Sequence, residues 1–172
     1  MIRTLLALVC ASTFLLTQTA TADIEVRFIE SAPKDRFVIA NRGECDLLNL
    51  AVEIDLAPSA GRLIFDTTAT GAGVDVYQPF EIATGDIELI SSPDVADGDA
   101  QLTLSIRRLS PAGSASFTID VDDTLPVSEL GMIRVAGSEI SNGLVRARVG
   151  QQEQVVAAFG SNGRATAMLP PC

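Results

Sequence analysis

The chain has 172 residues, with 12 basic and 22 acidic side chains and no histidine, so its formal net charge is −10. This charge argues against partners such as nucleic acids or anionic membranes, both of which need a basic protein surface. The lack of histidine excludes histidine-dependent catalytic triads, histidine general bases and the common zinc sites.

The first 22 residues are predicted to form a cleaved signal peptide. Arg3 supplies the positive charge, an apolar run covers 4–16, and Ala20-Thr21-Ala22 is a small-residue cleavage site. The apolar run is too short to span a hydrocarbon core of ~30 Å, so we expect no membrane span in the mature chain. Bulky Val9 before Cys10 argues against a lipoprotein site. We therefore expect an exported protein, periplasmic or extracellular, with one domain over residues 23–172 and a net charge of −11 once Arg3 is removed.

The mature region is predicted to be β structure throughout. Apolar and polar residues alternate with a period of two, which is typical of half-buried strands. In the clearest run, Leu48, Leu50, Val52, Ile54 and Leu56 are expected to share one buried face. The expected strands cover residues 24–29, 37–39, 48–56, 63–65, 80–90 with a turn at 84–86, 102–107 and 117–122. Ser-Asn-Gly turns at 141–143 and 161–163 punctuate the rest. Without any sustained helical stripe, the pattern predicts a single antiparallel β-sandwich of about seven to eleven strands.

Two cysteines, Cys45 and Cys172, remain after removal of the leader. In an oxidising compartment an even count predicts one disulfide. It would close a loop of about 127 residues and contribute about 2–4 kcal/mol of stability. The alternative is that Cys172 is a free chain end.

Six aspartates form the one group of residues that points to a ligand. Asp94, Asp97 and Asp99 precede the 102–107 strand, and the turn at 110–113 reverses the chain before the 117–122 strand. Both groups are therefore expected at the same end of the domain, where carboxylates could supply the six to eight oxygens that Ca²⁺ prefers. The alternative is plain surface acidity, because neither group matches a complete Asp-x-Asp-x-Asp-Gly calcium loop. The expected metal ligands are Asp94, Asp97, Asp99, Asp120, Asp122 and Asp123.

No catalytic residue is identified. The chain has no phosphate-binding Gly-x-x-x-x-Gly-Lys, no Gly-x-Ser-x-Gly and no dinucleotide-binding fingerprint. A sugar cleft is disfavoured because Tyr77 is the one tyrosine and there is no tryptophan. We therefore expect a protein that is not an enzyme. The alternative is a small enzyme or ligand-binding domain built around residues 66–75, which would require a concave pocket with a carboxylate of raised pKa.

Several strings resemble known exported families. Residues 37–43, 47–52 and 109–117 are similar to Ig-like domains of the CARDB kind. A closer resemblance, to bacterial exported proteins of the aggregation factor core family, lies in 32–37, 61–68, 71–74, 78–81, 117–124 and 137–140. This resemblance implies an Ig-like β-sandwich and a secreted or periplasmic adhesion function assisted by calcium. The partner would be a protein, a cell surface or a second copy of the chain.

Overall fold

The computed structural model describes residues 20–31, 34–74, 76–91, 94–131 and 134–172. The predicted leader, as far as residue 19, lies outside these described residues. Within them the chain forms eleven strands and one short helix. In chain order these are β1 (Ala22–Ile29), β2 (Asp35–Asn41), β3 (Leu47–Asp55), β4 (Ile64–Asp66), β5 (Glu81–Thr84), β6 (Ile87–Leu89), β7 (Gln101–Leu109), β8 (Ser114–Asp122), α1 (Gly137–Ile140), β9 (Leu144–Val149), β10 (Val155–Ala158) and β11 (Arg164–Leu169).

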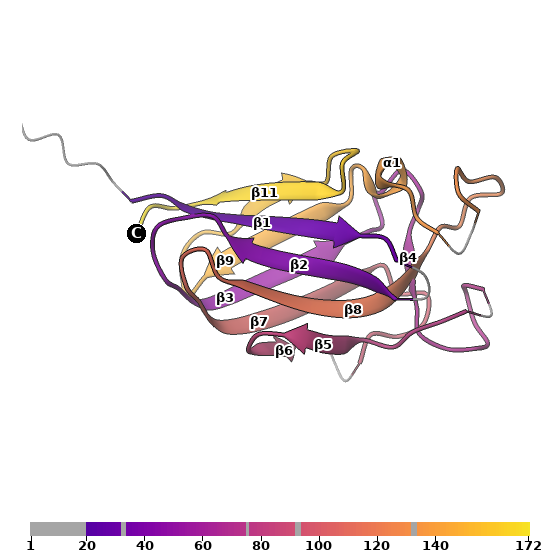
Figure 1. Ribbon diagram of the computed structural model, residues 1–172, viewed down its shortest axis with the longest axis horizontal. Helices are drawn as coiled ribbons and strands as arrows, with labels where there is room; N and C mark the ends of the chain where they lie inside the picture. Colours follow the sequence, from indigo (N-terminus) through magenta and orange to yellow (C-terminus); the bar gives the residue numbers. More distant parts are fainter. Residues whose placement is uncertain (1–19, 32–33, 75, 92–93, 132–133) are drawn as a thin grey trace, which may run out of the picture.

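Two antiparallel sheets pack face to face, so the predicted all-β sandwich is confirmed (Figure 1). Sheet A has the order β11-β1-β2-β8-β4, with β5 also paired to β8. Sheet B has the order β10-β9-β3-β7-β6. Figure 1 shows sheet A in front, with β4 at one end of the sandwich and the C-terminus at the other.

Alternation along the strands builds the core between the sheets. In β1 the buried residues Ala22, Ile24, Val26 and Phe28 point inward, while the intervening side chains face outward. Aromatic rings tie the strands of sheet A together at the core. Phe37 and Phe117 are cross-strand partners, and their stacked rings have centroids 5.1 Å apart. Burial of large apolar side chains of this kind contributes about 1.5–3 kcal/mol each.

One predicted face is wrong at its start. The alternation in β3 placed Leu48 in the core, but Leu48 is 52% exposed and Leu47 is buried instead. The cause is Asn49, whose φ of 53° lies in the left-handed region and interrupts the two-residue period. The register to β7 is the same on both sides of Asn49, with Leu48 opposite Arg108 and Leu50 opposite Ile106, but Asn49 itself is not paired with β7. Beyond Asn49, the predicted inward positions are all buried.

A disulfide joins Cys45 to Cys172, with Cα atoms 6.5 Å apart. The segment before Cys45 is held by Asn41, which is fully buried. Its amide donates to the carbonyls of Cys45 and Leu109, and its side-chain oxygen accepts from the Gly43 N–H. Gly43 is needed for close approach, because a Cβ there would lie 2.4 Å from the carbonyl oxygen of Thr21. The loop that carries Cys45 is thereby fixed against the start of β1.

The expected cleavage point falls inside the folded domain. Ala22 belongs to β1, pairs with Leu169 and is 4% exposed. The carbonyl of Thr21 also accepts a hydrogen bond from the Glu44 N–H. Among the described residues, no helix is long and apolar enough to cross a membrane.

Candidate metal centre

Strands β4 and β8 bring three aspartates together at one end of sheet A. Asp66 pairs directly with Asp120, and Asp122 lies two residues further along β8. Because Phe65 and Val121 point into the core, the three aspartates share the opposite face of the sheet. One ligand oxygen from each carboxylate can be chosen so that all three lie within 4.8 Å of one another.

The three carboxylates are buried without adequate hydrogen-bond partners. Asp66 and Asp122 are 0% exposed and Asp120 is 2% exposed. Both oxygens of Asp66, Oδ2 of Asp120 and Oδ1 of Asp122 have no hydrogen-bond partner. Like charges directly opposite on neighbouring strands are destabilising, and a buried charge without a partner is more so. The cluster therefore needs a proton or a cation.

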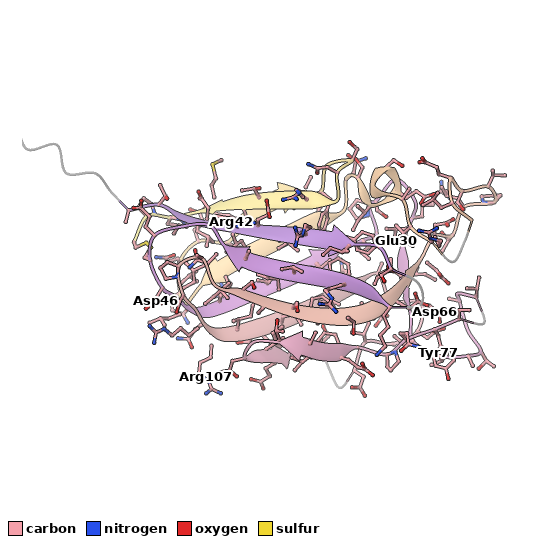
Figure 2. All side chains as sticks on the ribbon, in the orientation of Figure 1. Glu30, Arg42, Asp46, Asp66, Tyr77 and Arg107 are labelled. Atoms are coloured by element: carbon pink, nitrogen blue, oxygen red, sulfur yellow. A yellow bond between two sulfur atoms is a disulfide. The ribbon has the colours of Figure 1, made fainter. Side chains whose placement is uncertain are left out.

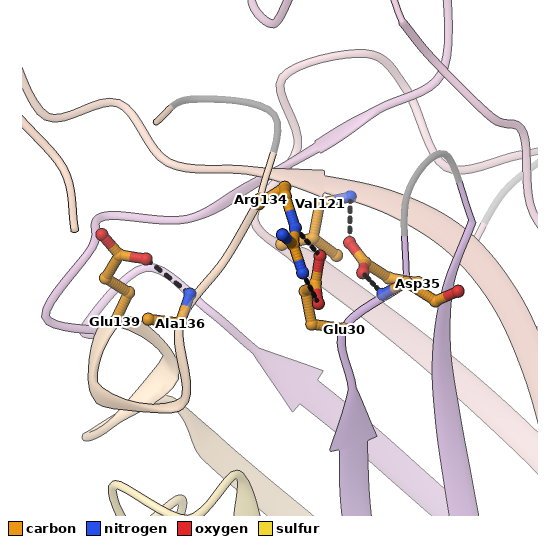
Figure 3. A network of polar contacts seen from close by, with 7 residues as sticks. Glu30, Asp35, Val121, Arg134, Ala136 and Glu139 are labelled. Atoms are coloured by element: carbon orange, nitrogen blue, oxygen red, sulfur yellow. Dashed lines mark hydrogen bonds and ion pairs between the residues drawn. The ribbon is translucent and has the colours of Figure 1, made fainter. Parts of the chain in front are cut away.

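Two other buried acids near this end have backbone donors for both of their carboxylate oxygens, whereas Asp66 has none for either. Asp35 accepts hydrogen bonds from the N–H groups of Ser31 and Val121, at 3.0 and 3.1 Å (Figure 3). Glu139 accepts from the N–H of Ala136 at 2.6 Å and from that of Glu129 at 3.0 Å. The backbone thus satisfies both oxygens of Asp35 and of Glu139 but neither oxygen of Asp66.

The segment 67–80, between β4 and β5, passes close to the cluster. The Val74 N–H donates to Oδ2 of Asp122 at 2.8 Å. Gly73 lies so near that a Cβ would come within 2.1 Å of Oδ2 of Asp66 and 2.5 Å of Oδ2 of Asp122. Only glycine allows the backbone to approach two carboxylates this closely. Figure 2 shows Asp66 and Tyr77 at the same end of the sandwich, far from Asp46 at the other.

Asp97 holds the first part of this segment in place through hydrogen bonds to its backbone. Its carboxylate accepts hydrogen bonds from the N–H groups of Thr67, Thr68 and Ala72, at 2.9, 3.1 and 2.9 Å. A Cβ on Gly71 would overlap Asp97, which explains glycine at that position. Although burial acts in the opposite direction, these backbone donors hold the pKa of Asp97 below its ordinary value. Asp97 therefore carries a negative charge close to the three unpartnered aspartates.

The pKa values of the three aspartates are raised. Burial is the main cause, and it raises the pKa of Asp66 to about 7 with help from the neighbouring carboxyls of Asp97 and Asp122. Burial and the charges of Asp122, Asp35 and Asp66 raise the pKa of Asp120 to about 8. Burial also raises the pKa of Asp122, despite the hydrogen bond from Val74.

The six predicted ligands lie in different surroundings. Asp120 and Asp122 are in the cluster. Asp97 lies beside it and accepts hydrogen bonds from the backbone of Thr67, Thr68 and Ala72. Asp123 is buried, with Oδ1 accepting from Leu125 N–H and Oδ2 unpartnered. Asp99 caps its own turn by accepting from the Ala96 N–H, and exposed Asp94 lines a separate depression.

Asp66 was not among the predicted ligands. The sequence places it after the expected 63–65 strand, at the start of the alternative ligand-binding loop 66–75. One feature of the sequence could have identified Asp66 as a candidate ligand. It directly follows an apolar run and precedes the small-residue segment 67–73. What places it opposite Asp120 is the pairing of β4 with β8.

The geometry of the cluster fits a hard divalent cation. Ca²⁺ binds oxygen ligands at about 2.3–2.6 Å, so two ligands on opposite sides of the ion lie about 5 Å apart. The three aspartate oxygens, which all lie within 4.8 Å of one another, are close enough to contact one ion of that size. Three carboxylates can supply up to six oxygens if each binds through both, and the unpartnered oxygens of Asp66 are free to do so.

A depression of about 260 Å³ is lined by Thr67, Thr68, Pro79, Phe80, Asp94 and Val95. It bears on the alternative that this region is a catalytic or ligand-binding pocket. The carboxylates with raised pKa, Asp66 and Asp120, are not part of its lining. The alternative requires a pocket that contains a carboxylate of raised pKa. The pocket and such carboxylates are both present, but the carboxylates do not line the pocket.

The raised pKa values predict how the metal-free protein responds to pH. Between about pH 4, where aspartates titrate in an unfolded chain, and about pH 8, the folded protein holds more protons than the unfolded one. Its free energy of unfolding should therefore fall as the pH rises through this window. Glu25 and Glu30 have lowered pKa values because each is paired with arginine. They affect the free energy of unfolding mainly at more acidic pH.

Urea unfolding of the chelator-treated protein at several pH values measures this trend. A free energy of unfolding that stays level or increases between pH 5 and about pH 8 would contradict the expectation, which rests on protons held by buried carboxyls. The same series with Asp35→Asn separates the contribution of Asp35, whose pKa burial raises to about 7.

Comparison with known proteins assigns no family: no family model matches the chain, and no curated protein matches it significantly.

Proposed function

We propose that this chain is an exported, non-enzymatic interaction module whose Asp66 end is completed by a bound Ca²⁺ ion. The observation that carries the proposal is the set of buried, unpartnered carboxylate oxygens on Asp66, Asp120 and Asp122. A cation neutralises their mutual repulsion and supplies the partner that the protein does not.

Calcium is favoured over magnesium by the kind of ligands. Mg²⁺ retains several waters and is usually bound by one or two carboxylates, whereas Ca²⁺ accepts a larger, less regular set of oxygens. Three converging aspartates that are fully or almost fully buried provide many oxygens and little room for water. The nearby charge of Asp97 further favours a divalent ion.

The role as an interaction module is supported by the surface around this end. The segment 67–80, held by Asp97 and Asp122, carries the partly exposed side chains Val76 and Tyr77, at 36 and 37% exposure. Exposed apolar and aromatic residues of this kind are typical of binding surfaces. The disulfide at the opposite end suits an oxidising, exported environment. An adhesive role also agrees with the resemblance to aggregation factor core proteins.

The proposal is tested by a bead-clustering assay. Microbeads coated with the domain should cluster in millimolar Ca²⁺ and disperse when a chelator is added. Beads coated with Asp66→Asn should remain dispersed, because this variant lacks a central ligand. Beads coated with Asp94→Asn are the matched control, because Asp94 is exposed and lies outside the cluster, and they should cluster like the wild type.

Two results would count against the proposal. Clustering that is unaffected by the chelator would separate adhesion from the cation. If wild-type beads cluster neither with one another nor with bacterial cells in Ca²⁺, the adhesive role is wrong even where the ion binds.

A further inference from the structure

A second depression, whose lining includes none of the three clustered aspartates, lies on the outer face of sheet A. It has a volume of about 390 Å³ and is formed over β1, β2 and β8. Its lining comprises Ile29, Ser31, Lys34, Arg36 and Thr118. Arg36 is cross-strand neighbour to both Ile29 and Thr118, so the pairing of these strands positions the lining. Volumes of about 300–1,000 Å³ are typical of small-molecule sites.

The charge of this depression is opposite to that of the protein. The whole chain has a net charge of −10, yet both charged side chains in the lining are cationic. Among the described residues, Arg36 has neither an ion-pair partner nor a side-chain hydrogen bond. Arg27, on the same outer face of β1, also has no ion pair there, and its Nε is buried without a partner.

Three exposed or partly exposed glutamates around the depression are each paired with a cation. Glu25 accepts hydrogen bonds from two guanidinium groups, from Arg42 at 2.8 Å and from Arg164 at 3.1 Å. Glu30 forms a fork with Arg134 through contacts of 2.7 and 3.0 Å (Figure 3). The exposed carboxylate of Glu81 is paired with Lys34, where it occupies the position that an external anion would take.

We propose that this depression binds a small molecule that carries a carboxylate or phosphate group. The Arg36 guanidinium offers paired donors that match the oxygens of either anion, and Lys34 adds a second positive charge. The hydroxyls of Ser31 and Thr118 can bond the polar part of the ligand, and Ile29 can pack against its carbon skeleton. A densely charged polyanion such as a nucleic acid is disfavoured by the net charge and by the lack of aromatic residues in the lining.

The test is a titration followed by NMR of the ¹⁵N-labelled protein with three probes that share one sugar ring. Glucuronate supplies a carboxylate, glucose 6-phosphate supplies a phosphate, and glucose is the neutral control. At least one anion should shift the amide resonances of Ser31, Arg36 and Thr118 in a saturable manner, and glucose should not. Which anion binds more tightly identifies the group that the site prefers.

Two variants should change the affinity in opposite directions. Arg36→Gln should weaken binding by about tenfold or more, because it removes a charge-assisted hydrogen bond. Glu81→Gln should tighten binding by about two- to fivefold, because it removes the carboxylate that competes for Lys34. Arg107→Gln is the matched control, since Arg107 is an exposed arginine on β7 paired with Asp86, and it should bind like the wild type.

The proposal is overturned if neither anion shifts these resonances, if glucose shifts them equally, or if Arg107→Gln weakens binding as much as Arg36→Gln. Tighter binding by Glu81→Gln cannot arise from damage to the fold, so it distinguishes a site from a structural effect. Asp66→Asn should still bind the anion in a saturable manner, so failure of this proposal and failure of the calcium proposal can be told apart.

Discussion

Replacing Asp66 by asparagine should raise the melting temperature of the metal-free protein and abolish its response to calcium. The metal-free effect arises because Asp66 lies opposite Asp120 and has no hydrogen-bond partner. An uncharged amide removes the repulsion and can donate to the neighbouring carboxylates. Relief of such a like-charge pair is worth about 1 kcal/mol, or about 2–4 °C for a domain of this size.

The calcium response of the wild type should be larger. At a free calcium concentration about 100 times Kd, binding to the folded state adds about 2.7 kcal/mol, or about 5–11 °C. Thermal unfolding in chelator, in Ca²⁺ and in Mg²⁺ measures both effects, and Mg²⁺ controls for general screening of the acidic surface. Asp94→Asn should retain the calcium shift. A lower metal-free melting temperature for Asp66→Asn, together with an intact calcium shift, would show that Asp66 is an ordinary structural residue.

Removing the Cys45–Cys172 disulfide should lower the free energy of unfolding by about 2–4 kcal/mol. The bridge joins residues separated by 127 positions, so it restricts most of the unfolded chain. For a domain of this size the loss corresponds to a decrease of about 4–16 °C in melting temperature. The measurement compares the wild type with the Cys45→Ala/Cys172→Ala variant, each melted with and without reductant.

The reductant is the internal control for this prediction. It should lower the melting temperature of the wild type to that of the variant and leave the variant unchanged. Equal melting temperatures for the oxidised wild type and the variant would show that the bridge does not contribute to stability. The calcium response should survive in the variant, because the disulfide and Asp66 lie at opposite ends of the sandwich (Figures 1 and 2).

The strands as far as β8 were predictable because their burial follows a local, two-residue period, whereas β9, β10 and β11 were not assigned. This period placed β1, β7 and β8 correctly, and the Thr84-Gly85-Asp86 turn separated β5 from β6. It failed at Leu48, where the left-handed conformation of Asn49 shifts the face of the strand. Asparagine adopts this conformation more readily than most residues, but no local pattern shows that it does so inside this strand.

The aspartate cluster was predictable only in part, because its geometry depends on long-range pairing. Asp120 and Asp122 alternate with apolar residues in β8, so their shared face follows from the sequence. Asp66 joins them through the register of the three-residue strand β4, which no local pattern specifies. Asp97 is a residue of the type that binds Ca²⁺, but its carboxylate accepts hydrogen bonds from three backbone N–H groups instead. Carboxylate clusters alone therefore do not reveal which members are free to bind an ion.

The most direct test of the calcium centre is a calorimetric titration of Ca²⁺ into chelator-treated protein at neutral pH. The wild type should bind one tightly held ion per chain and release protons, because the pKa values of Asp66 and Asp120 are raised to about 7 and about 8 in the metal-free state. Asp66→Asn should lose this binding, whereas Asp94→Asn should keep it. Absence of saturable binding in the wild type, or equal binding by Asp66→Asn, would contradict the assignment of this cluster as a calcium site.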